Sequence, residues 1–277
     1  MKKLNIFFIV ALLAFLLAAC GSEEESDSDT GGDSGEKASG DSSELNLVED
    51  GKLTFAASGE FKPFSYMEDG KMVGYDIAVG QAIAEKLGLE PVQQKAKFAG
   101  IVAGVKTGRY DIAVASHTIN EKRLKEVNFS DPYYYAGPAI FTRPDSDIKS
   151  AEDLDGKEIS VSRGSNYVDI ATEYTDDIPQ VDSDVVALQS LAKGHHDAVI
   201  TNAITGQTAI DSGLEIENRG QLGVSKQAVA VAKENEKLLE AVNGALKELK
   251  ESGKLKEIAM EWVGVDITQK PDKLKEN

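Results

Sequence analysis

The strongest constraint on the fold is a regular alternation of short apolar strands with amphipathic helices in the first half of the chain. Successive parallel strands need a crossover connection, usually a helix, and such crossovers are right-handed. The alternation therefore predicts a parallel sheet covered by helices. The expected strands are residues 53–57, 91–95 and 111–115, and the expected helices are 75–87 and 98–106.

A second series of the same kind follows, with expected strands at 158–161, 180–181 and 198–200 and expected helices at 165–174, 183–193 and 202–212. A further strand at 228–232 and two helices at 234–251 and 255–263 are expected to finish the chain. We therefore expect an α/β protein with two hinged lobes and a parallel-dominated sheet in each. Extended segments between two lobes are typical of folds that close around a ligand. The predicted lobe 1 comprises residues 51–138 and 229–277, and the predicted lobe 2 comprises 139–228.

The segment 111–135 carries a candidate anion site. Its first strand is followed by Ser116-His117-Thr118, expected as a polar turn, then by a short charged helix with Arg123 and a strand ending at Asp131-Pro132. In open α/β sheets, ligands bind outside the carboxyl ends of the strands. A guanidinium group binds a carboxylate with two parallel hydrogen bonds. Our hypothesis is that Arg123, assisted by Thr118 and Ser116, holds the carboxylate of a small solute.

The N-terminus has the pattern of a secretory signal peptide over residues 1–19, with two lysines before an apolar run. Leu17 to Gly21 contains Cys20, the single cysteine, and resembles the bacterial lipobox, in which the cysteine is acylated. Two acyl chains, such as palmitate, on one residue give stable membrane anchoring. The acidic segment 20–50 is expected to be a disordered tether. Its length favours a Gram-positive cell surface, with the body on the extracytoplasmic face.

Charge and composition exclude several function classes. The 277 residues carry a formal charge of −17, whereas nucleic-acid binding needs a clustered basic face. His195-His196 has too few further ligands at workable spacing to indicate a metal site. We expect no cofactor, no metal and no nucleic acid, and a monomeric protein.

Four segments together carry a resemblance to a known family. They are FKPFSY (61–66), GYDIAVGQAIAEKLG (74–88), GRYDIAVASHTINEKRLKEVNFSDPYYYAG (108–137) and LKEIAMEWVGVDIT (255–268). With these segments the chain resembles the solute-binding proteins of ABC importers for polar amino acids, related to the histidine-, glutamine- and arginine-binding proteins. That resemblance implies the type II periplasmic-binding-protein fold, a ligand held between two lobes and a membrane permease as partner.

The resemblance also implies roles for individual residues. Arg123 would clamp the ligand carboxylate with Thr118 and Ser116, and Ser165 and Asn166 would add free backbone N–H groups from a helix N-terminus. The remaining positions are Phe61 and Phe98, which would pack on the ligand side chain, Ser58, where some members have an aspartate, and Asn202, where many have the aspartate that pairs with the ligand ammonium.

Asn202 is a departure from that pattern, because it carries no charge. A buried unpaired ammonium is costly, so either another acid supplies the charge or the ligand has no standard α-amino group. Glu60 and Asp76 are the nearest acids, although Asp76 is more typical of a helix cap and Glu60 of a solvated loop. A neutral Asn202 favours a neutral amino acid, a cystine-like molecule or an unusual carboxylate over arginine or lysine.

Two other functions stay open on this scaffold. One is an enzyme of the dehydratase type, for which His117 and Glu60 are the suggestive groups. The other is a sensor that reports the solute to a membrane protein. His117 itself could contact ligand and give a pH-dependent affinity, or could be a hydrogen-bonded loop histidine. The leading prediction is a non-catalytic receptor that delivers a captured amino acid or related carboxylate to a permease.

Overall fold

The computed structural model describes residues 44–271. The expected signal peptide, the acylated Cys20 and most of the expected tether lie outside these residues. Within them, no helix combines the length and the apolar character that a membrane crossing requires.

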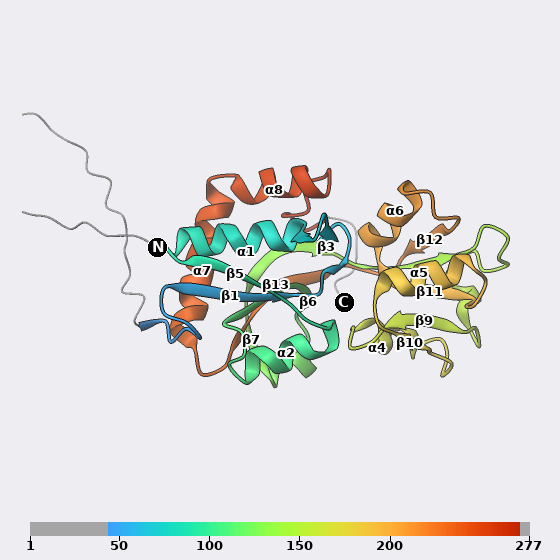
Figure 1. Cartoon of the computed structure of the whole chain (residues 1–277). Helices are drawn as coiled ribbons and strands as arrows, with labels where there is room; N and C mark the ends of the chain where they lie inside the picture. Colours follow the sequence, from blue (N-terminus) through green and yellow to red (C-terminus); the bar gives the residue numbers. More distant parts are fainter. Residues whose placement is uncertain (1–43, 272–277) are drawn as a thin grey trace, which may run out of the picture. The chain divides into compact units, whose positions relative to one another are not determined.

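The first sheet has five strands in the order β5-β1-β6-β13-β7, and we call the part of the chain built on it lobe 1. β1 pairs in parallel with β5 and β6, whereas β13 runs antiparallel to β6 and β7. Four of the five strands therefore point the same way, which confirms the expected α/β class with a parallel-dominated sheet (Figure 1). The strands are β1 (Lys52–Ala57), β5 (Glu90–Lys95), β6 (Ile112–Thr118), β7 (Val127–Ala136) and β13 (Ser225–Ala232).

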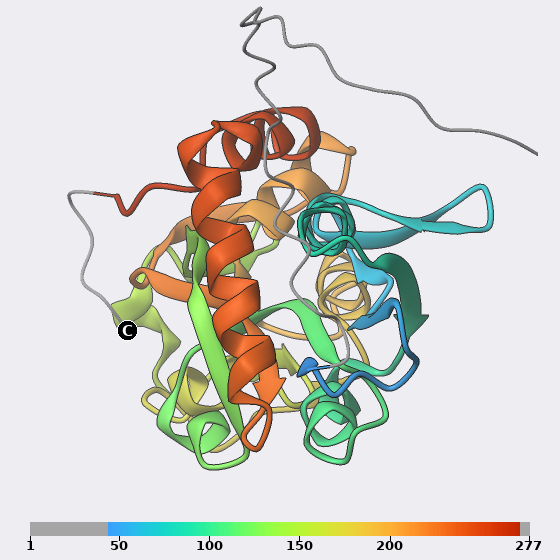
Figure 2. The ribbon, with the colours of Figure 1, turned by 90° about the vertical axis from the view of Figure 1, so that its left-hand side faces the viewer.

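Helices cover both faces of this sheet. α1, α7 and α8 lie on one side and α2 on the other (Figure 1), and α7 runs along the sheet in the view of Figure 2. Of the apolar face that its 3–4 spacing predicts, Leu239 is half-buried and the other residues are buried, at Leu238, Val242, Ala245, Leu246 and Leu249. The helices are α1 (Tyr75–Lys86), α2 (Phe98–Lys106), α3 (Glu121–Leu124), α7 (Glu236–Glu251) and α8 (Lys254–Trp262).

The start of α1 differs from the expectation for Asp76. The N-cap is Gly74, and no side chain caps the helix. Instead, the N–H groups of Tyr75 and Asp76 donate to the carbonyl oxygens of Pro63 and Phe64, at 3.1 and 2.8 Å. A Cβ at Gly74 would lie 2.4 Å from the Phe64 oxygen, so only glycine permits this approach. The carboxylate of Asp76 is thereby free for a different role.

A small antiparallel sheet follows β1, in a segment for which we predicted no strand. It has the order β2-β3-β4 and lies between β1 and α1 in the chain. These strands are too short to give a clear alternating pattern in the sequence. They are β2 (Glu60–Phe61), β3 (Ser65–Glu68) and β4 (Lys71–Val73).

The second sheet, in what we call lobe 2, repeats the arrangement with the order β10-β9-β11-β8-β12. β9, β10 and β11 are parallel, and β8 is antiparallel to β11 and β12. The helices α5 and α6 lie on one face and α4 on the other (Figure 1). The elements are β8 (Pro138–Thr142), the 3-10 turn η2 (Ala151–Leu154), β9 (Ile159–Ser162), α4 (Tyr167–Ala171), β10 (Gln180–Val181), α5 (Asp184–Ala192), β11 (Ala198–Asn202), α6 (Ala203–Asp211) and β12 (Glu217–Gln221).

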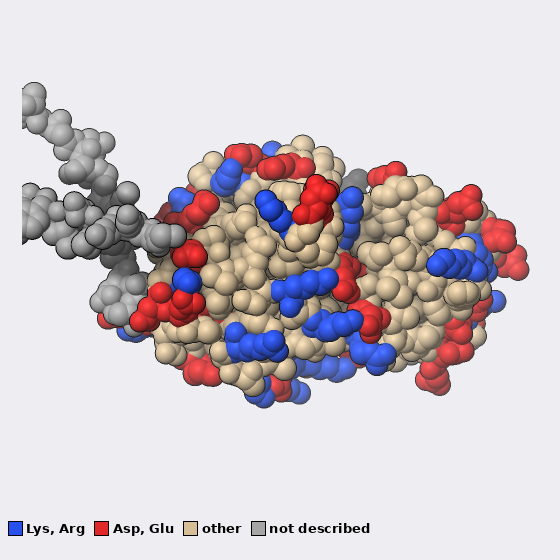
Figure 3. Space-filling view, viewed as in Figure 1, with Lys and Arg blue, Asp and Glu red and all other residues tan. Residues whose placement is uncertain are grey.

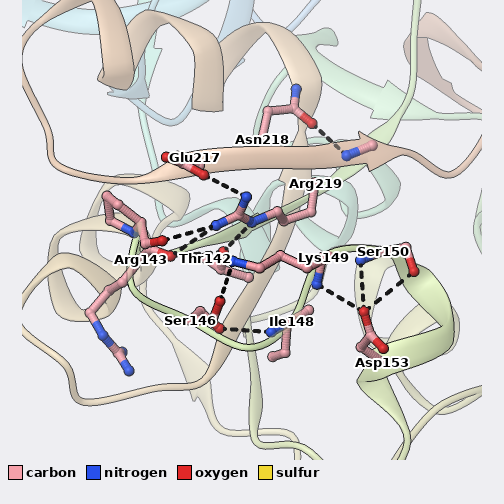
Figure 4. Close-up of polar contacts among 12 residues, drawn as sticks. Thr142, Arg143, Ser146, Ile148, Lys149, Ser150, Asp153, Glu217, Asn218 and Arg219 are labelled. Atoms are coloured by element: carbon pink, nitrogen blue, oxygen red, sulfur yellow. Dashed lines mark hydrogen bonds and ion pairs between the residues drawn. The ribbon is translucent and has the colours of Figure 1, made fainter.

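Arg219 of β12 donates hydrogen bonds to the loop that follows β8 (Figure 4). Its Nε donates to Thr142 Oγ1 at 2.8 Å, and Nη2 donates to the Arg143 carbonyl at 3.3 Å. Glu217 neutralises the guanidinium at 2.5 Å. Because β12 is polar, the pattern of apolar runs did not predict it. Its charged residues hold the β8 loop at the edge of the sheet in lobe 2.

Two segments connect the lobes, one between β7 and β8 and one between β12 and β13. They touch at Gly137, where a Cβ would lie 1.8 Å from the carbonyl oxygen of Gly223. β13 begins at Ser225 and belongs to the first sheet. Residues 225–228, which we assigned to lobe 2, are therefore in lobe 1.

The segment 44–50 was expected to be part of the disordered tether, but it packs on lobe 1. Leu45 and Leu47 contact its apolar core. The N–H of Val48 donates to Asp111 Oδ1 at 2.7 Å, and Asp111 Oδ2 accepts from Thr54 Oγ1 at 2.5 Å. Two leucines and a buried carboxylate are enough to order the end of the segment.

Three other expectations about elements were wrong. Residues 116–118 continue β6 instead of forming a turn, because Thr118 and His117 pair with β13. β7 does not end at Pro132 but runs to Ala136. α4 begins at Tyr167 and is shorter than the expected helix 165–174.

Candidate functional site

A cavity lies between the carboxyl ends of the two sheets and is lined from both lobes. It is narrow, with about 30 Å³ of space for water-sized groups, so the lobes lie close together. Seven of the nine residues predicted to bind ligand line it. The lining residues are Ser58, Glu60, Phe61, Phe98, Ser116 and Arg123 from lobe 1, and Ser162, Ser165, Asn166, Tyr167, Asp182, Ser183 and Asp184 from lobe 2.

Arg123 is the buried cation of this cavity. Asn120 caps α3 by accepting the Arg123 backbone N–H at 2.8 Å, which fixes the start of the helix that carries the side chain. Nη1 donates to the Thr118 carbonyl at 2.8 Å and Nη2 to the Gly164 carbonyl of lobe 2 at 3.1 Å. Burial lowers the Arg123 pKa to about 10, so the guanidinium stays charged at neutral pH. Its carbonyl partners do not neutralise it, and within residues 44–271 the other three of its five N–H groups have no hydrogen-bond partner.

Ser116 is held in an unusual backbone conformation beside the cavity. Its φ of 56° is left-handed, which is uncommon for a residue with a Cβ. The Ser116 N–H donates to the Tyr133 hydroxyl at 3.0 Å, and the Ser116 hydroxyl donates to Asp76 Oδ2 at 2.8 Å. The Tyr133 hydroxyl in turn donates to Asp76 Oδ1 at 2.6 Å. Local strain is thus compensated by three hydrogen bonds.

Asp76, the acid at the centre of this network, is fully buried and does not line the cavity. Burial raises its pKa to about 7, against the lowering effect of the bonds from Tyr133 and Ser116. Asp76 therefore supports the cavity wall through Ser116. Glu60, the other acid considered, does line the cavity and lies 3.4 Å from Lys95.

His117 is 1% exposed and does not line the cavity. Its ring stacks on Phe98 at 4.7 Å, and within residues 44–271 its Nδ1 has no hydrogen-bond partner. Burial, together with the nearby charge of Arg123, holds the His117 pKa well below its usual value. The ring thus remains neutral and supports Phe98, an arrangement that favours neither ligand contact nor a pH-dependent affinity.

The lobe 2 wall differs from the expectation at Ser165. Its backbone N–H is not free, because it donates to the Ser162 carbonyl at 3.2 Å, and its hydroxyl donates to the same oxygen at 2.7 Å. Asn166 precedes α4, and its side chain makes no capping hydrogen bond. Both residues line the cavity.

Asp184 and Tyr167 are cavity residues that the sequence analysis missed. Asp184 is the first residue of α5. Its side chain and that of Tyr167 are each 8% exposed. Asp184 Oδ1 accepts from Ser162 Oγ at 3.1 Å and from Thr201 Oγ1 at 2.5 Å. The signal was the pair of acids in Val181-Asp182-Ser183-Asp184, which we interpreted only as the start of a helix. Because β10 ends at Val181, that start lies at the carboxyl end of a strand.

Two predicted residues, Thr118 and Asn202, are buried but do not line the cavity. The Asn202 carbonyl Oδ1 caps α6 by accepting the N–H of Ile204 at 2.9 Å. The backbone oxygen of Thr118 accepts a hydrogen bond from Arg123.

Ser58 lines the cavity, and its hydroxyl lies 3.2 Å from the Ser65 hydroxyl. Among the described residues, no cluster of His, Cys, Asp and Glu could hold a metal ion.

Comparison with known proteins gives a consistent assignment. Residues 53–265 match the model of the bacterial extracellular solute-binding proteins, family 3. The L-cystine-binding protein TcyJ of Escherichia coli K12 is 31% identical over 246 residues, which cover 84% of this chain and 91% of the relative. The arginine-binding extracellular protein ArtP of Bacillus subtilis is 30% identical over 273 residues, with coverage of 95% and 98%.

A solved structure agrees with the sequence relatives. An ancestral arginine-binding protein bound to arginine superposes with a TM-score of 0.73 at 35% identity, covering 76% of this chain and 98% of that chain. The family match spans both lobes and the cavity between them. The chain belongs to the bacterial extracellular solute-binding proteins, family 3.

Proposed function

We propose that this protein captures an amino acid between its two lobes and delivers it to the permease of an ABC importer. The observation that carries the proposal is Arg123, a charged guanidinium 9% exposed, with no acid within ion-pair distance in residues 44–271. A buried charge without a counter-charge is costly. A ligand carboxylate supplies that counter-charge and can use the fork geometry of the guanidinium.

The names of the relatives support an amino acid as the carboxylate. TcyJ is named for L-cystine and ArtP for arginine. The aromatic rings of Phe61 and Phe98, both cavity-lining, offer apolar surface to a side chain. We infer binding without turnover, because the neutral, buried His117 is poorly placed to act as the acid or base that a dehydratase would need.

We further propose that the protein is a monomer and is held on the extracytoplasmic face of the cell membrane by acylation of Cys20, after removal of residues 1–19. The lipobox-like sequence around Cys20 supports this anchor. Substitution Cys20→Ala should release the protein from the membrane fraction, whereas unchanged sedimentation with membranes would refute the anchor.

The ligand is first identified by mass spectrometry of the small molecules that co-purify with the protein. Calorimetry with that ligand then compares wild type with Arg123→Lys, which keeps the charge but loses the fork, and with Arg123→Ala. We expect the alanine variant to bind at least about 30-fold more weakly, as for loss of one partner of a buried charge pair. The lysine variant should be intermediate.

Arg109→Ala is the matched control, because Arg109 is an exposed arginine of the same lobe beyond α2. It should leave the affinity unchanged. Wild-type affinity in Arg123→Ala, with the melting temperature also unchanged, would refute the carboxylate site. Release of a chemically altered ligand by the wild type would favour an enzyme instead.

A further inference from the structure

The cavity contains three carboxylates, and their partners distinguish them. Glu60 forms an ion pair with Lys95, with 3.4 Å between Oε1 and Nζ, and Asp182 forms one with Lys97, with 2.6 Å between Oδ2 and Nζ. Asp184 has no lysine, arginine or histidine within ion-pair distance in the described part of the chain. It is also the most buried of the three, at 8% exposed. Asp184 is thus the acid of the cavity that lacks a cation.

Asp184 is also held rigidly. The two hydroxyls that donate to it come from β9 and β11, the strands on which the α5 helix packs. Both bonds end on Oδ1, so neither side chain occupies Oδ2. A carboxylate fixed in this way can accept a hydrogen bond from a ligand without a further loss of side-chain conformational entropy.

Arg123 is the counterpart on the opposite wall. Its guanidinium donates to two carbonyl oxygens and has no acid partner among residues 44–271. The cavity therefore holds one buried guanidinium on lobe 1 and one buried carboxyl group on lobe 2, and neither has a partner of opposite charge within residues 44–271. Burial raises the pKa of Asp184, and the bonds from Thr201 and Ser162 lower it. Tyr167, also in the cavity wall, senses both groups: burial and then the charge of Asp184 raise the Tyr167 pKa, and the charge of Arg123 lowers it. Each buried charge without a counter-charge disfavours the site unless a ligand supplies one.

We propose that Asp184 is the counter-charge for a cationic group of the ligand, in place of the acid expected at position 202. This inference rests on the proposed function and deepens it: the ligand bridges the lobes as a zwitterion, with its carboxylate on Arg123 and its cation on Asp184. Asn202 does not take this role, since its oxygen caps α6. The cation is an ammonium or guanidinium group, which can belong to the α-carbon or to the side chain.

The test measures the affinities of the full-length chain for each of the twenty protein L-amino acids and L-cystine by calorimetry, in wild type and Asp184→Asn. Asparagine keeps the size of the side chain and an oxygen acceptor for Ser162 and Thr201. We expect each bound amino acid whose cation pairs with Asp184 to lose at least about 30-fold in affinity, as for a buried charge pair that loses one member. Loss for every amino acid assigns Asp184 to the α-ammonium, and loss for lysine and arginine alone assigns it to a side-chain cation.

Asp145→Asn is the matched control, because Asp145 is an acid of the same lobe whose side chain is 83% exposed. It should bind as the wild type does. Thermal unfolding establishes that each variant is folded. Wild-type affinity for all ligands in a folded Asp184→Asn would overturn the inference while leaving the proposed function intact.

A second measurement needs no substitution. The wild type is compared for the best amino acid and its 2-hydroxy analogue, and for arginine and citrulline, which differ in charge more than in shape. At least one of these changes should weaken binding by about 30-fold or more. Equal binding within both pairs would overturn the role of Asp184. If no amino acid binds the wild type, the proposed function fails and this inference fails with it.

Discussion

Arg123 and Asp184 show what single residues reveal in a sequence and what they do not. Arg123 was predictable because a strand, hydroxyl residues and a lone arginine follow one another in a single segment. Asp184 was not, because its identity as a cavity acid depends on Ser162 and Thr201, two hydroxyls that lie 22 and 17 positions away in the sequence. An acid at a helix start is ordinary in any sequence. Only its burial without a cation makes it a candidate.

Asp76 is a second buried acid whose state has a measurable consequence. Its folded pKa is about 7, against 3.8 for the isolated group. Between these values the folded state holds a proton that the unfolded state has lost. The folded state binds more protons in this range, so the Asp76 contribution to stability falls as the pH rises from about 4 to 7. The total fall is on the order of 4 kcal/mol, since each pKa unit corresponds to about 1.4 kcal/mol.

Replacing Asp76 with asparagine should remove this fall. We expect the free energy of unfolding of Asp76→Asn, measured with urea, to increase relative to that of wild type as the pH rises from 5 to 8. The difference between the proteins is the relevant quantity, because the low pKa of the buried His117 gives the wild type an opposite slope below about pH 6.5. Asp131→Asn, at an exposed position on β7, is the control. A constant difference between Asp76→Asn and wild type across this range would contradict the titration of Asp76.

At the scale of elements, prediction succeeded where the apolar periodicity is local. α2 has the expected bounds, and α7 buries the expected face. It failed where a neighbouring strand decides the outcome. Ser116-His117-Thr118 is as polar as a turn, yet pairing with β13 keeps it in β6. β12 is polar along its whole length and exists because it pairs with β8. Such cross-strand pairing is absent from any single window of sequence.

The left-handed Ser116 links an element to the site. The β13 pairing partners of β6 shift in register between Ala228 and Ala230, which is the signature of a bulge. A bulge at this place turns Ser116 out of the regular strand, so that its backbone approaches the cavity while its hydroxyl reaches Asp76. The prediction of Ser116 as a site residue came from its place after a predicted strand and from the family resemblance. The physical basis for its position is a strand irregularity that the residue types do not encode locally.

At the scale of the whole folded unit, ion pairs join the two lobes. Lys97 forms an ion pair with Asp182, and Lys122 forms one with Asp169. In both pairs the Nζ atom lies 2.6 Å from a carboxylate oxygen, and each pair joins lobe 1 to lobe 2. Acidic and basic side chains lie together along the junction between the lobes (Figure 3). The apparent affinity of a ligand depends on the fraction of molecules in the binding-competent form. Pairs that favour closure should therefore tighten binding without touching the ligand.

The double variant Lys97→Ala/Lys122→Ala tests this coupling. We expect a modest loss of ligand affinity in calorimetry, largest at low ionic strength, because salt screens exposed ion pairs over about 10 Å at 0.1 M and about 3 Å at 1 M. Small-angle X-ray scattering without ligand should show a larger radius of gyration than for wild type. Lys106→Ala is the control, since Lys106 is also exposed and pairs with Glu126 inside lobe 1. An equal loss in Lys106→Ala, or a loss that does not change with salt, would show that the pairs between the lobes do not govern closure.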